Sequence, residues 1–369
     1  MRDFSTVSRL VIKIGTSTLS TDGGVNTAAI RAVAEDVTEL HRSGKEIAIV
    51  TSGAIGMGAG LLGRTERVTG IRLRQACAAI GQPLIMEEYR RAFLEFQINV
   101  AQVLLTADVL SKRETYLNLR NVFETLFSLR VIPVINENDS VSTEEIGSAF
   151  GDNDRLSAYV ASKIDASLLI LLSDIDALYD RDPRSDPKAR PIRMVPEITR
   201  EIEQYAGGTG SVHASGGMKT KLEAARIASR AGCSLVLADG SVPRVIPQIL
   251  SGQEIGTWFL PKKKLAQRIR WLLNSSPKGT IRVDDGALAA LKRNKSLLPS
   301  GITAVEGEFE CGDVVMINRS AKAVTGFSAA ELRLLAGRHS SEIQTLLGAG
   351  RKDVVATPEN IVFIDSGKE

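Results

Sequence analysis

The sequence predicts an α/β protein with two domains: a three-layer α/β/α sandwich with a mostly parallel central sheet, followed by a small β-rich domain. Apolar runs alternate with amphipathic stretches up to about residue 260, the pattern of a parallel sheet covered by helices on both faces. At 369 residues the chain is too long for one compact core. From residue 279 onward, short Val and Ile segments with glycine turns predict the small β-rich domain.

Six short runs rich in Val, Ile and Leu predict the strands of the large sheet. They cover residues 9–14, 46–50, 98–105, 131–135, 167–172 and 234–238. The run at 167–172 is almost wholly apolar, so we expect a central strand that is buried on both faces.

Amphipathic stretches between these runs predict the covering helices, at residues 27–41, 71–96, 108–129, 151–163 and 218–231. Asn26 or Thr27 can cap the first helix, and Gly44 ends it. Pro83 lacks an amide hydrogen, so we expect a break or a new first turn there. The polar segment 179–187 contains two prolines and predicts an exposed loop.

The change of pattern near residue 261 sets the expected domain bounds. We expect residues 1–260 to form the large domain, residues 261–276 a linker helix and residues 277–369 the small domain. Residues 262–369 hold 17 Lys and Arg against 12 Asp and Glu, whereas the rest of the chain holds 29 against 31. This modest basic excess is compatible with RNA binding, but it falls short of the clustered basic face that such binding usually shows.

Composition points to an ordinary globular protein, with 43% hydrophobic and 24% charged residues and no apolar run long enough to cross a bilayer. The first residues lack the apolar core of a signal peptide. Cys77, Cys233 and Cys311 are scattered without metal-ligand spacing, so we expect free thiols buried in the core. We therefore expect a cytoplasmic protein that is not attached to a membrane.

Small or polar residues follow five of the predicted strands. In open α/β sheets, ligands bind outside the carboxyl ends of the strands, so these residues should converge on one site. They lie at 13–16, 51–54, 136–139, 173–174 and 238–240.

Two turns combine glycine with lysine. The first strand ends in Lys13-Ile14-Gly15-Thr16-Ser17, and a second turn, residues 215–221, runs into a helical stretch. Glycine lets the backbone approach an anion closely, and a helix N-terminus favours negative charge. One such turn is usually an ordinary tight turn, but two turns with a lysine each favour nucleotide phosphates. P-loop, dinucleotide-binding and protein-kinase signatures are absent from the sequence.

The sequence has few histidines that could act as a general base, which limits the reactions that the site could catalyse. The three histidines are His41, His213 and His339, and none lies near a serine or cysteine in a hydrolase pattern. We expect His41 on a helix surface. A carboxylate acceptor is already ionised at pH 7, so phosphoryl transfer to it needs positioning and charge neutralisation but no general base.

The lysines of the two turns suit that reaction. Lys13 and Lys221 could approach a transferring phosphate from either side and stabilise its equatorial oxygens. Asp154 could orient both ammonium groups, although it could also be a simple helix cap. Asp174 could help to hold Mg²⁺ or nucleotide.

With these motifs in place, the chain resembles the amino acid kinase family, and within it the branch that acts on glutamate and carries a C-terminal PUA domain. The resemblance covers nearly the whole length. The kinase part is carried by residues 11–17, 50–55, 134–139, 151–154, 178–185 and 216–221. The PUA part is carried by residues 278–287 and 296–302.

The resemblance implies roles for individual residues. Asp154 organises the catalytic pair Lys13 and Lys221. Glutamate is held by Ser52, Asp139 and Asn153. The residues implied in ATP binding are Lys13, Gly15, Ser173, Asp174, Ser215, Gly216, Gly217, Met218, Lys219, Thr220 and Lys221. The family usually has Thr at position 215 and often a small residue at position 219, and the resemblance assigns no metal ligands.

The resemblance also implies ATP with Mg²⁺ as cofactors, L-glutamate as the acceptor, feedback inhibition by proline, and a homodimer or homotetramer. Two alternatives remain open at this stage. The chain could be an amino acid kinase that acts on a different acceptor. It could also be an RNA-associated protein whose kinase-like domain is only a scaffold, although the intact lysine pair and the polar turn at 136–139 argue against that interpretation.

Overall fold

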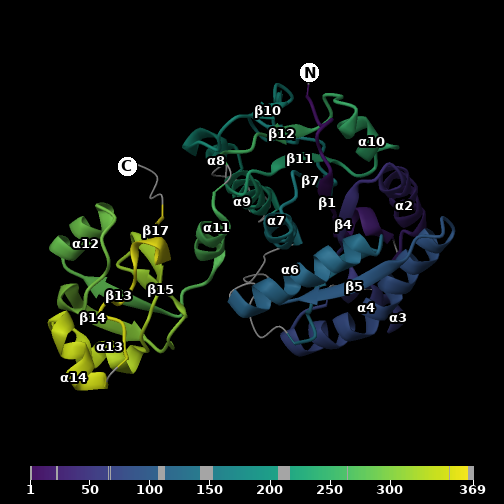
Figure 1. Cartoon of the computed structure of the whole chain (residues 1–369). Coiled ribbons are helices and arrows are strands. Elements are labelled where there is room, and N and C mark those ends of the chain that lie inside the picture. The colour runs from purple at the N-terminus through teal and green to yellow at the C-terminus, as the bar shows by residue number, and fades with distance from the viewer. Residues whose placement is uncertain are drawn as a thin grey trace. The chain divides into compact units, whose positions relative to one another are not determined.

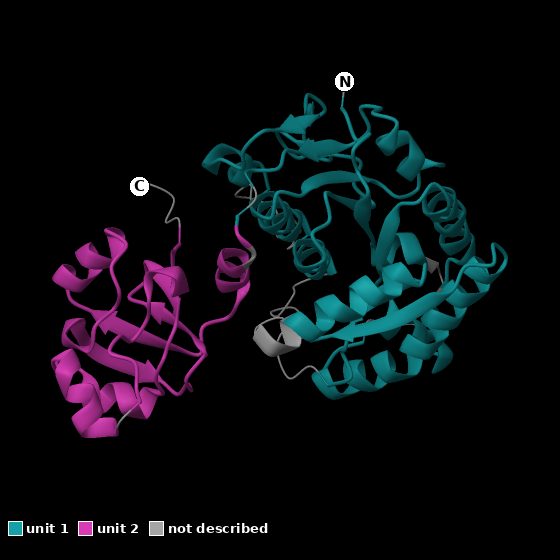
Figure 2. Ribbon diagram, viewed as in Figure 1, with its two compact units in different colours: residues 1–110, 114–265 teal, residues 111–113, 266–369 magenta. Residues whose placement is uncertain are grey.

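The computed structural model divides the chain into two compact units (Figure 2). Unit 1 comprises residues 1–110 and 114–265, and unit 2 comprises residues 111–113 and 266–369. The residues that the structure describes are 2–21, 24–64, 66, 68–106, 113–141, 153–206, 217–263, 265–348 and 350–364. The predicted helix start at Asp108 and the residues Gly151, Asp152 and His213 lie outside the described part of the chain. The predicted domain bounds stay predictions.

Unit 1 is built on an eight-stranded sheet with the order β10-β12-β11-β7-β1-β4-β6-β5 (Figure 1). Its strands are β1 (Arg9–Ile14), β4 (Glu46–Val50), β5 (Val100–Leu105), β6 (Ile132–Glu137), β7 (Leu168–Ser173), β10 (Met194–Val195), β11 (Ser234–Asp239) and β12 (Thr257–Phe259). Neighbouring strands are parallel except for β11 and β12. The predicted mostly parallel sheet is therefore confirmed.

Helices cover both faces of this sheet. One face packs against α2 (Thr27–Arg42), α4 (Ile71–Leu94) and α10 (Val245–Leu250). The other packs against α6 (Arg113–Ser128), α7 (Asn153–Lys163), α8 (Arg200–Ala206) and α9 (Gly217–Arg230). Successive residues of a strand point to opposite faces, so Val11 and Ile12 belong to different apolar clusters. Every residue of β7 is buried, as expected of a central strand.

The remaining elements of unit 1 are short and lie at its edges and in its loops. They are α1 (Thr16–Leu19), β2 (Ser20–Thr21), β3 (Gly24–Val25), α3 (Ala54–Leu61), β8 (Leu178–Tyr179) and β9 (Pro191–Ile192). The exposed loop predicted at 179–187 follows β8. Among the described residues, we find no helix with the length and apolar character needed to span a bilayer.

Pro83 does not interrupt its helix, so the predicted break is wrong. Helix α4 runs unbroken from Ile71 to Leu94 and packs against α3, which the sequence did not predict. Gly81 is where the two helices touch, because a Cβ atom there would lie 1.8 Å from the carbonyl oxygen of Ala54. Likewise, a Cβ atom on Gly58 would lie 1.9 Å from the carbonyl oxygen of Cys77. This close packing offsets the one helical hydrogen bond that Pro83 cannot donate.

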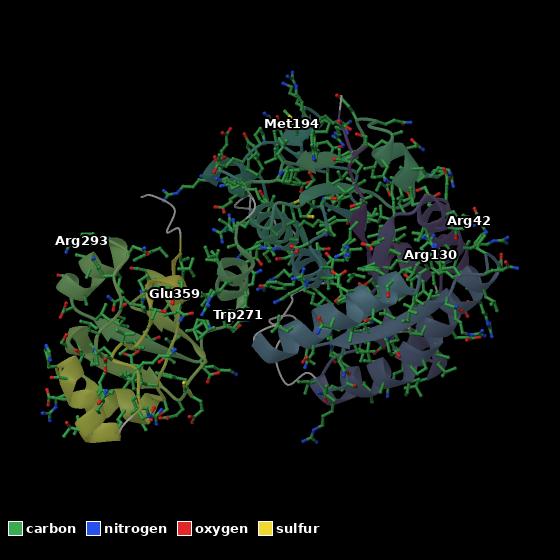
Figure 3. The ribbon with its side chains drawn as sticks, viewed as in Figure 1. Arg42, Arg130, Met194, Trp271, Arg293 and Glu359 are labelled. Carbon is green, nitrogen blue, oxygen red and sulfur yellow. The ribbon has the colours of Figure 1, made fainter. Side chains whose placement is uncertain are left out.

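Two further expectations need correction. His41 is buried rather than exposed. Nη2 of Arg130, which is labelled in Figure 3, donates a hydrogen bond of 2.5 Å to the carbonyl oxygen of His41 and lies 3.5 Å from its Nδ1, so the arginine covers the imidazole. Burial and the neighbouring Arg130 charge lower the pKa of His41. Cys77 and Cys233 are buried free thiols, but Cys311 is exposed because it lies in a turn of unit 2.

Asp36 gives unit 1 a pH-dependent contact. The carboxylate of Asp36 on α2 lies 2.8 Å from Nη1 of Arg244, and burial raises its pKa to about 6 although the Arg244 charge opposes the shift. A raised pKa in the folded state means that this group stabilises the fold at low pH, and that the stabilisation is lost as pH rises through about 6. We therefore expect the stability difference between wild type and Asp36→Asn to shift in favour of wild type between pH 7 and pH 4.5, as measured by urea unfolding. A difference that stays constant over this range would contradict the raised pKa.

Unit 2 contains a five-stranded sheet with the order β14-β13-β15-β16-β17. Its strands are β13 (Gly279–Val283), β14 (Ile302–Gly307), β15 (Val314–Ile317), β16 (Ala321–Val324) and β17 (Ile361–Phe363). Its helices are α11 (Gln267–Asn274), α12 (Asp285–Lys292), α13 (Ala329–Leu335) and α14 (Ile343–Leu347), with the short 3-10 helices η1 (Pro299–Gly301), η2 (Ser340–Glu342) and η3 (Pro358–Asn360). Side chains from these strands and helices pack around one apolar core, so the predicted small β-rich domain is confirmed.

Candidate active site

Two lysines and one aspartate meet near the carboxyl end of β1. Lys13 is near the end of β1, Asp154 is in the first turn of α7, and Lys221 is in the second turn of α9. The Nζ atom of Lys13 lies 2.7 Å from Oδ1 of Asp154, and Nζ of Lys221 lies 3.0 Å from Oδ2. The exposed fractions of the three side chains are 2%, 0% and 5%, in chain order. One buried carboxylate therefore bridges two buried ammonium groups, and we call these residues the lysine bridge.

Charge pairing keeps Asp154 ionised. Burial by itself raises the pKa of Asp154, but the charges and hydrogen bonds of Lys13 and Lys221 outweigh burial, so the pKa lies below its usual value. The hydroxyl of Thr220 lies 3.1 Å from Oδ2 as well. Because Asp154 contacts both lysines, it is more than a simple helix cap. The three charges of the lysine bridge leave one net positive charge in a buried place, which suits an incoming phosphate oxygen.

Two glycines, Gly15 and Gly217, lie beside the lysine bridge. A Cβ atom on Gly15 would lie 3.2 Å from the carbonyl oxygen of Leu172 and 3.6 Å from Nζ of Lys13. A Cβ atom on Gly217, the first residue of α9, would meet nothing within 4 Å. The backbone of Gly217 is therefore accessible close to the Lys221 ammonium group, which lies 3.3 Å from its carbonyl oxygen, as an anion site requires. The Gly15 amide instead donates a hydrogen bond of 3.0 Å to the carbonyl oxygen of Leu172.

The ends of β1, β7 and β11 converge as predicted. Gly240 donates a hydrogen bond of 2.8 Å to the carbonyl oxygen of Ser173, and a Cβ atom on Gly240 would lie 2.9 Å from Oγ1 of Thr18. The hydroxyl of Ser173 donates to Oδ1 of Asp174 over 3.0 Å, and Asp174 is exposed. These strand ends therefore form one continuous edge.

The residues of the second turn differ in exposure. Met218 is half-buried and packs against the apolar cluster on this face of the sheet, whereas Lys219 is exposed. Ser215 and Gly216 lie outside the residues that the structure describes.

A second polar cluster adjoins the lysine bridge through Asn153. The Nδ2 atom of Asn153 lies 3.1 Å from Oγ of Ser52 and 2.8 Å from Oδ1 of Asn136, and it also donates to the carbonyl oxygen of Thr51. Nδ2 of Asn136 donates in turn to Oε1 of Gln82 over 2.8 Å. All of these residues are buried. We call these residues the amide cluster. Since Asn153 directly precedes Asp154, the amide cluster lies next to the lysine bridge.

Sequence reasoning missed two members of the amide cluster. Asn136 lies in a predicted polar strand end but received no role, and Gln82 received none either. Gln82 gives no local signal, because a glutamine in an amphipathic helix is usually exposed. Its burial follows from the close packing of α4 against α3.

Asp139 and Arg74 form a charged group beyond the end of β6. Asp139 is half-buried, and burial raises its pKa although the nearby positive charge of Arg74 opposes the shift. Arg74 projects from the first turn of α4, and its Nε atom is buried without a hydrogen-bond partner among the described residues. A buried donor without an acceptor costs free energy, so Arg74 is suited to donate a hydrogen bond to a ligand oxygen. The sequence signal for Arg74 was only an arginine within an amphipathic helix.

A metal site made of protein side chains alone does not form in the described part of the chain, where no three His, Cys, Asp or Glu side chains gather to hold an ion. Mg²⁺ usually keeps several waters and binds one or two carboxylates together with substrate phosphates. The donors at this edge of the sheet fit an ion that is held mainly by nucleotide phosphates.

Comparison with known proteins gives consistent results over the whole chain. The profile of the amino acid kinase family matches residues 8–239, and the profile of the PUA domain matches residues 279–347. A glutamate 5-kinase from Methanosarcina acetivorans is 44% identical over 98% of this chain and 97% of that protein. The enzymes of the same name from Methanosarcina mazei and Carboxydothermus hydrogenoformans are 45% and 44% identical, and each alignment covers at least 97% of both chains.

Proposed function

Because the chain belongs to the amino acid kinase family, we propose that it transfers the γ-phosphoryl group of ATP to the side-chain carboxylate of L-glutamate, the first step of proline biosynthesis. The observation that carries the phosphoryl transfer is the lysine bridge of Lys13, Asp154 and Lys221. The choice of glutamate rests on full-length similarity to glutamate 5-kinases.

The reaction follows from the charges at the site. A carboxylate oxygen of glutamate attacks the γ-phosphorus, the bond between that phosphorus and the bridging oxygen breaks, and its electron pair leaves with ADP. No proton has to be removed, because the acceptor carboxylate is ionised at neutral pH. Lys13 and Lys221 stabilise the charge on the equatorial oxygens, and Asp154 holds both ammonium groups in place. Mg²⁺ bound with ATP neutralises phosphate charge, and Asp174 is the carboxylate that we propose for it.

The remaining site assignments divide between the two substrates. We propose that Gly15, Ser173 and the turn at 215–221 bind ATP at the edge formed by β1, β7 and β11. We propose that Ser52, Asp139 and Asn153 hold glutamate beside the lysine bridge. The amide cluster supports this division, since it ends at Asn153, the neighbour of Asp154.

Arg74 completes the glutamate site in this proposal. Glutamate carries an α-ammonium group and an α-carboxylate besides the carboxylate that reacts. Asp139 suits the ammonium group, and the unpaired Nε of Arg74 suits the α-carboxylate.

We expect Arg74→Gln to raise the KM for glutamate about 10- to 100-fold, because a hydrogen bond to a charged group contributes about 1.5–3 kcal/mol. The KM for ATP should change less than threefold or so. Steady-state kinetics with each substrate varied in turn measures both values. An equal rise in the two KM values would mean that Arg74 acts through the fold and not on glutamate.

The proposed reaction is tested by trapping the acyl phosphate. ATP is supplied with hydroxylamine and one acceptor at a time: L-glutamate, N-acetylglutamate, aspartate, carbamate or UMP. We expect a hydroxamate from glutamate and none from N-acetylglutamate or aspartate, and no ATP consumption with carbamate or UMP. Product from another acceptor would support the phosphoryl-transfer site but contradict the assignment of glutamate as the substrate.

Three properties of the assembled enzyme are proposed from the family. We propose that proline competes with glutamate, that the chain forms a homodimer or homotetramer, and that the enzyme works in the cytoplasm. The free thiols of Cys77, Cys233 and Cys311 suit a reducing compartment. Glutamate saturation curves that are unchanged by millimolar proline would exclude the first, and a monomeric mass by light scattering would exclude the second.

A further inference from the structure

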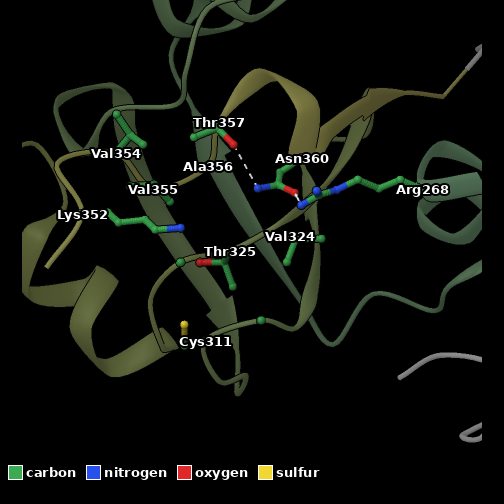
Figure 4. Close-up of a pocket in the computed structure, with 12 residues that line it drawn as sticks. Arg268, Cys311, Val324, Thr325, Lys352, Val354, Val355, Ala356, Thr357 and Asn360 are labelled. Atoms are coloured by element: carbon green, nitrogen blue, oxygen red, sulfur yellow. Dashed lines mark hydrogen bonds between the residues drawn. The ribbon is translucent and has the colours of Figure 1, made fainter. Parts of the chain in front are cut away.

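A pocket of about 210 Å³ lies wholly within unit 2 (Figure 4). Four segments that are distant in sequence form its wall. They are α11, the turn before β15, the end of β16, and residues 352–360. We call it the tail pocket. None of the functions derived above uses it.

The charged side chains of the tail pocket are all positive. Arg268 comes from α11 and Lys352 from the segment after α14, and they enter the pocket from opposite sides (Figure 4). None of the residues that line the pocket is an aspartate or a glutamate. Glu359 lies just outside the lining, where a hydrogen bond from the Thr357 hydroxyl and the charges of Arg268 and Lys352 lower its pKa. Two cations and this one carboxylate leave one net positive charge, which attracts a negatively charged group.

Arg268 is fixed in place but not fully satisfied. Its Nη2 donates to Oδ1 of Asn360, and Nδ2 of Asn360 lies 2.9 Å from Oγ1 of Thr357 (Figure 4). The Nε of Arg268 is buried and has no hydrogen-bond partner among the described residues. A buried donor that lacks a partner favours a bound acceptor. The guanidinium is therefore preorganised for an oxygen ligand.

The rest of the wall is mainly apolar. Val324, Val354 and Val355 line it together with Ala356. Such a wall favours a compact molecule with an apolar part, which bare phosphate or a hydrated metal ion lacks.

We propose that the tail pocket binds a small organic anion. Its carboxylate or phosphate group contacts Arg268 and Lys352, and its apolar part contacts Val324 and Val354. The two cations lie in one small, partly open pocket and the basic excess of residues 262–369 is modest, so a small ligand fits these observations better than an extended polyanion does.

Cys311 provides a built-in reporter of binding. It lines the pocket and is exposed, whereas Cys77 and Cys233 are buried. An uncharged reagent such as N-ethylmaleimide should therefore modify Cys311 first in the folded full-length chain. A ligand in the pocket should slow that modification.

The experiment measures the rate of Cys311 modification by mass spectrometry with n-butyrate, n-butyl phosphate, inorganic phosphate, n-butanol or a short RNA present. We expect saturable protection by n-butyrate or n-butyl phosphate, at least tenfold tighter than by n-butanol or inorganic phosphate. The comparison of the first two decides between a carboxylate and a phosphate ligand. Protection in the double variant Arg268→Gln/Lys352→Gln should be lost, while Arg319→Gln, which removes an exposed cation outside the pocket, should keep it.

Several results would overturn the proposal. No saturable protection by either organic anion would do so, and so would equal protection in the double variant. Protection by n-butanol as strong as by the anions would remove the role of the cations. Protection by inorganic phosphate at the same concentration would remove the role of the apolar wall, and protection by RNA alone would assign the pocket to a nucleic acid.

Discussion

Lys221→Ala is expected to lower kcat by about 10²- to 10³-fold, the loss that follows when one preorganised charge is removed from a transition state. The variant leaves Lys13 paired with Asp154, so the lysine bridge loses its net positive charge while the β1 side of the site keeps its contact. The measurement is kcat for hydroxamate formation with saturating glutamate and ATP. Arg230→Gln, near the end of the same helix α9, is the matched control and should retain wild-type kcat.

A second variant tests whether the charged groups act as a unit. Asp154→Asn should lower kcat by a similar factor, because both ammonium groups lose the carboxylate that orients them. Groups that act together give non-additive losses, so Asp154→Asn/Lys221→Ala should be far more active than the product of the two single losses predicts. Circular dichroism and thermal unfolding check that each variant is folded. A kcat within threefold of wild type for folded Lys221→Ala would mean that the transferring phosphate lies elsewhere.

Gly81→Ala is expected to destabilise unit 1 by about 3 kcal/mol or more, at the upper end of the usual cost of overpacking. The new Cβ atom would lie 1.8 Å from the carbonyl oxygen of Ala54 and 2.6 Å from the amide nitrogen of Gly58, so α3 and α4 must move apart. The measurement is the free energy of urea unfolding. Gly56→Ala is the control on α3, because its Cβ atom would meet nothing within 4 Å and alanine favours a helix.

The same variant has a functional consequence. Ser52 lies just before α3 and Gln82 lies next to Gly81 on α4, so separating the helices pulls the amide cluster apart. We expect the KM for glutamate to rise more than the KM for ATP. A variant that is as stable as Gly56→Ala would contradict the close packing of the two helices.

The sequence predicts those features of the fold and the site that depend on residues close together along the chain. Strand β7 is apolar at each position up to its final serine, and Lys13 and Lys221 each lie beside a glycine turn at the end of a predicted element, so local patterns were enough to place them. Asp154 could be assigned a role because a phosphate site with two lysines needs a counter-charge. Its contacts with both lysines agree with that reasoning.

The features that were missed depend on contacts between distant segments. The burial of Gln82 and the continuity of α4 through Pro83 both follow from the contact of Gly81 with α3, and no pattern within either segment shows that contact. The role of Arg74 was missed for a similar reason. It depends on Asp139, which lies near the Arg74 charge but follows another strand, β6. Cys311 was placed wrongly because cysteine is usually buried, whereas here it lies in a turn.

The position of β1 in the sheet affects how the chain folds as it is made. Strand β1 pairs with β4 on one side and with β7 on the other, and β7 begins at Leu168. A ribosome adds about 5–20 residues per second, so β1 waits for its second neighbour for on the order of ten seconds. During that time one edge of a very apolar strand is exposed, which favours pairing with other chains. Newly made chains should therefore depend on chaperones until β7 has left the ribosome, because only then can β1 pair on both of its sides.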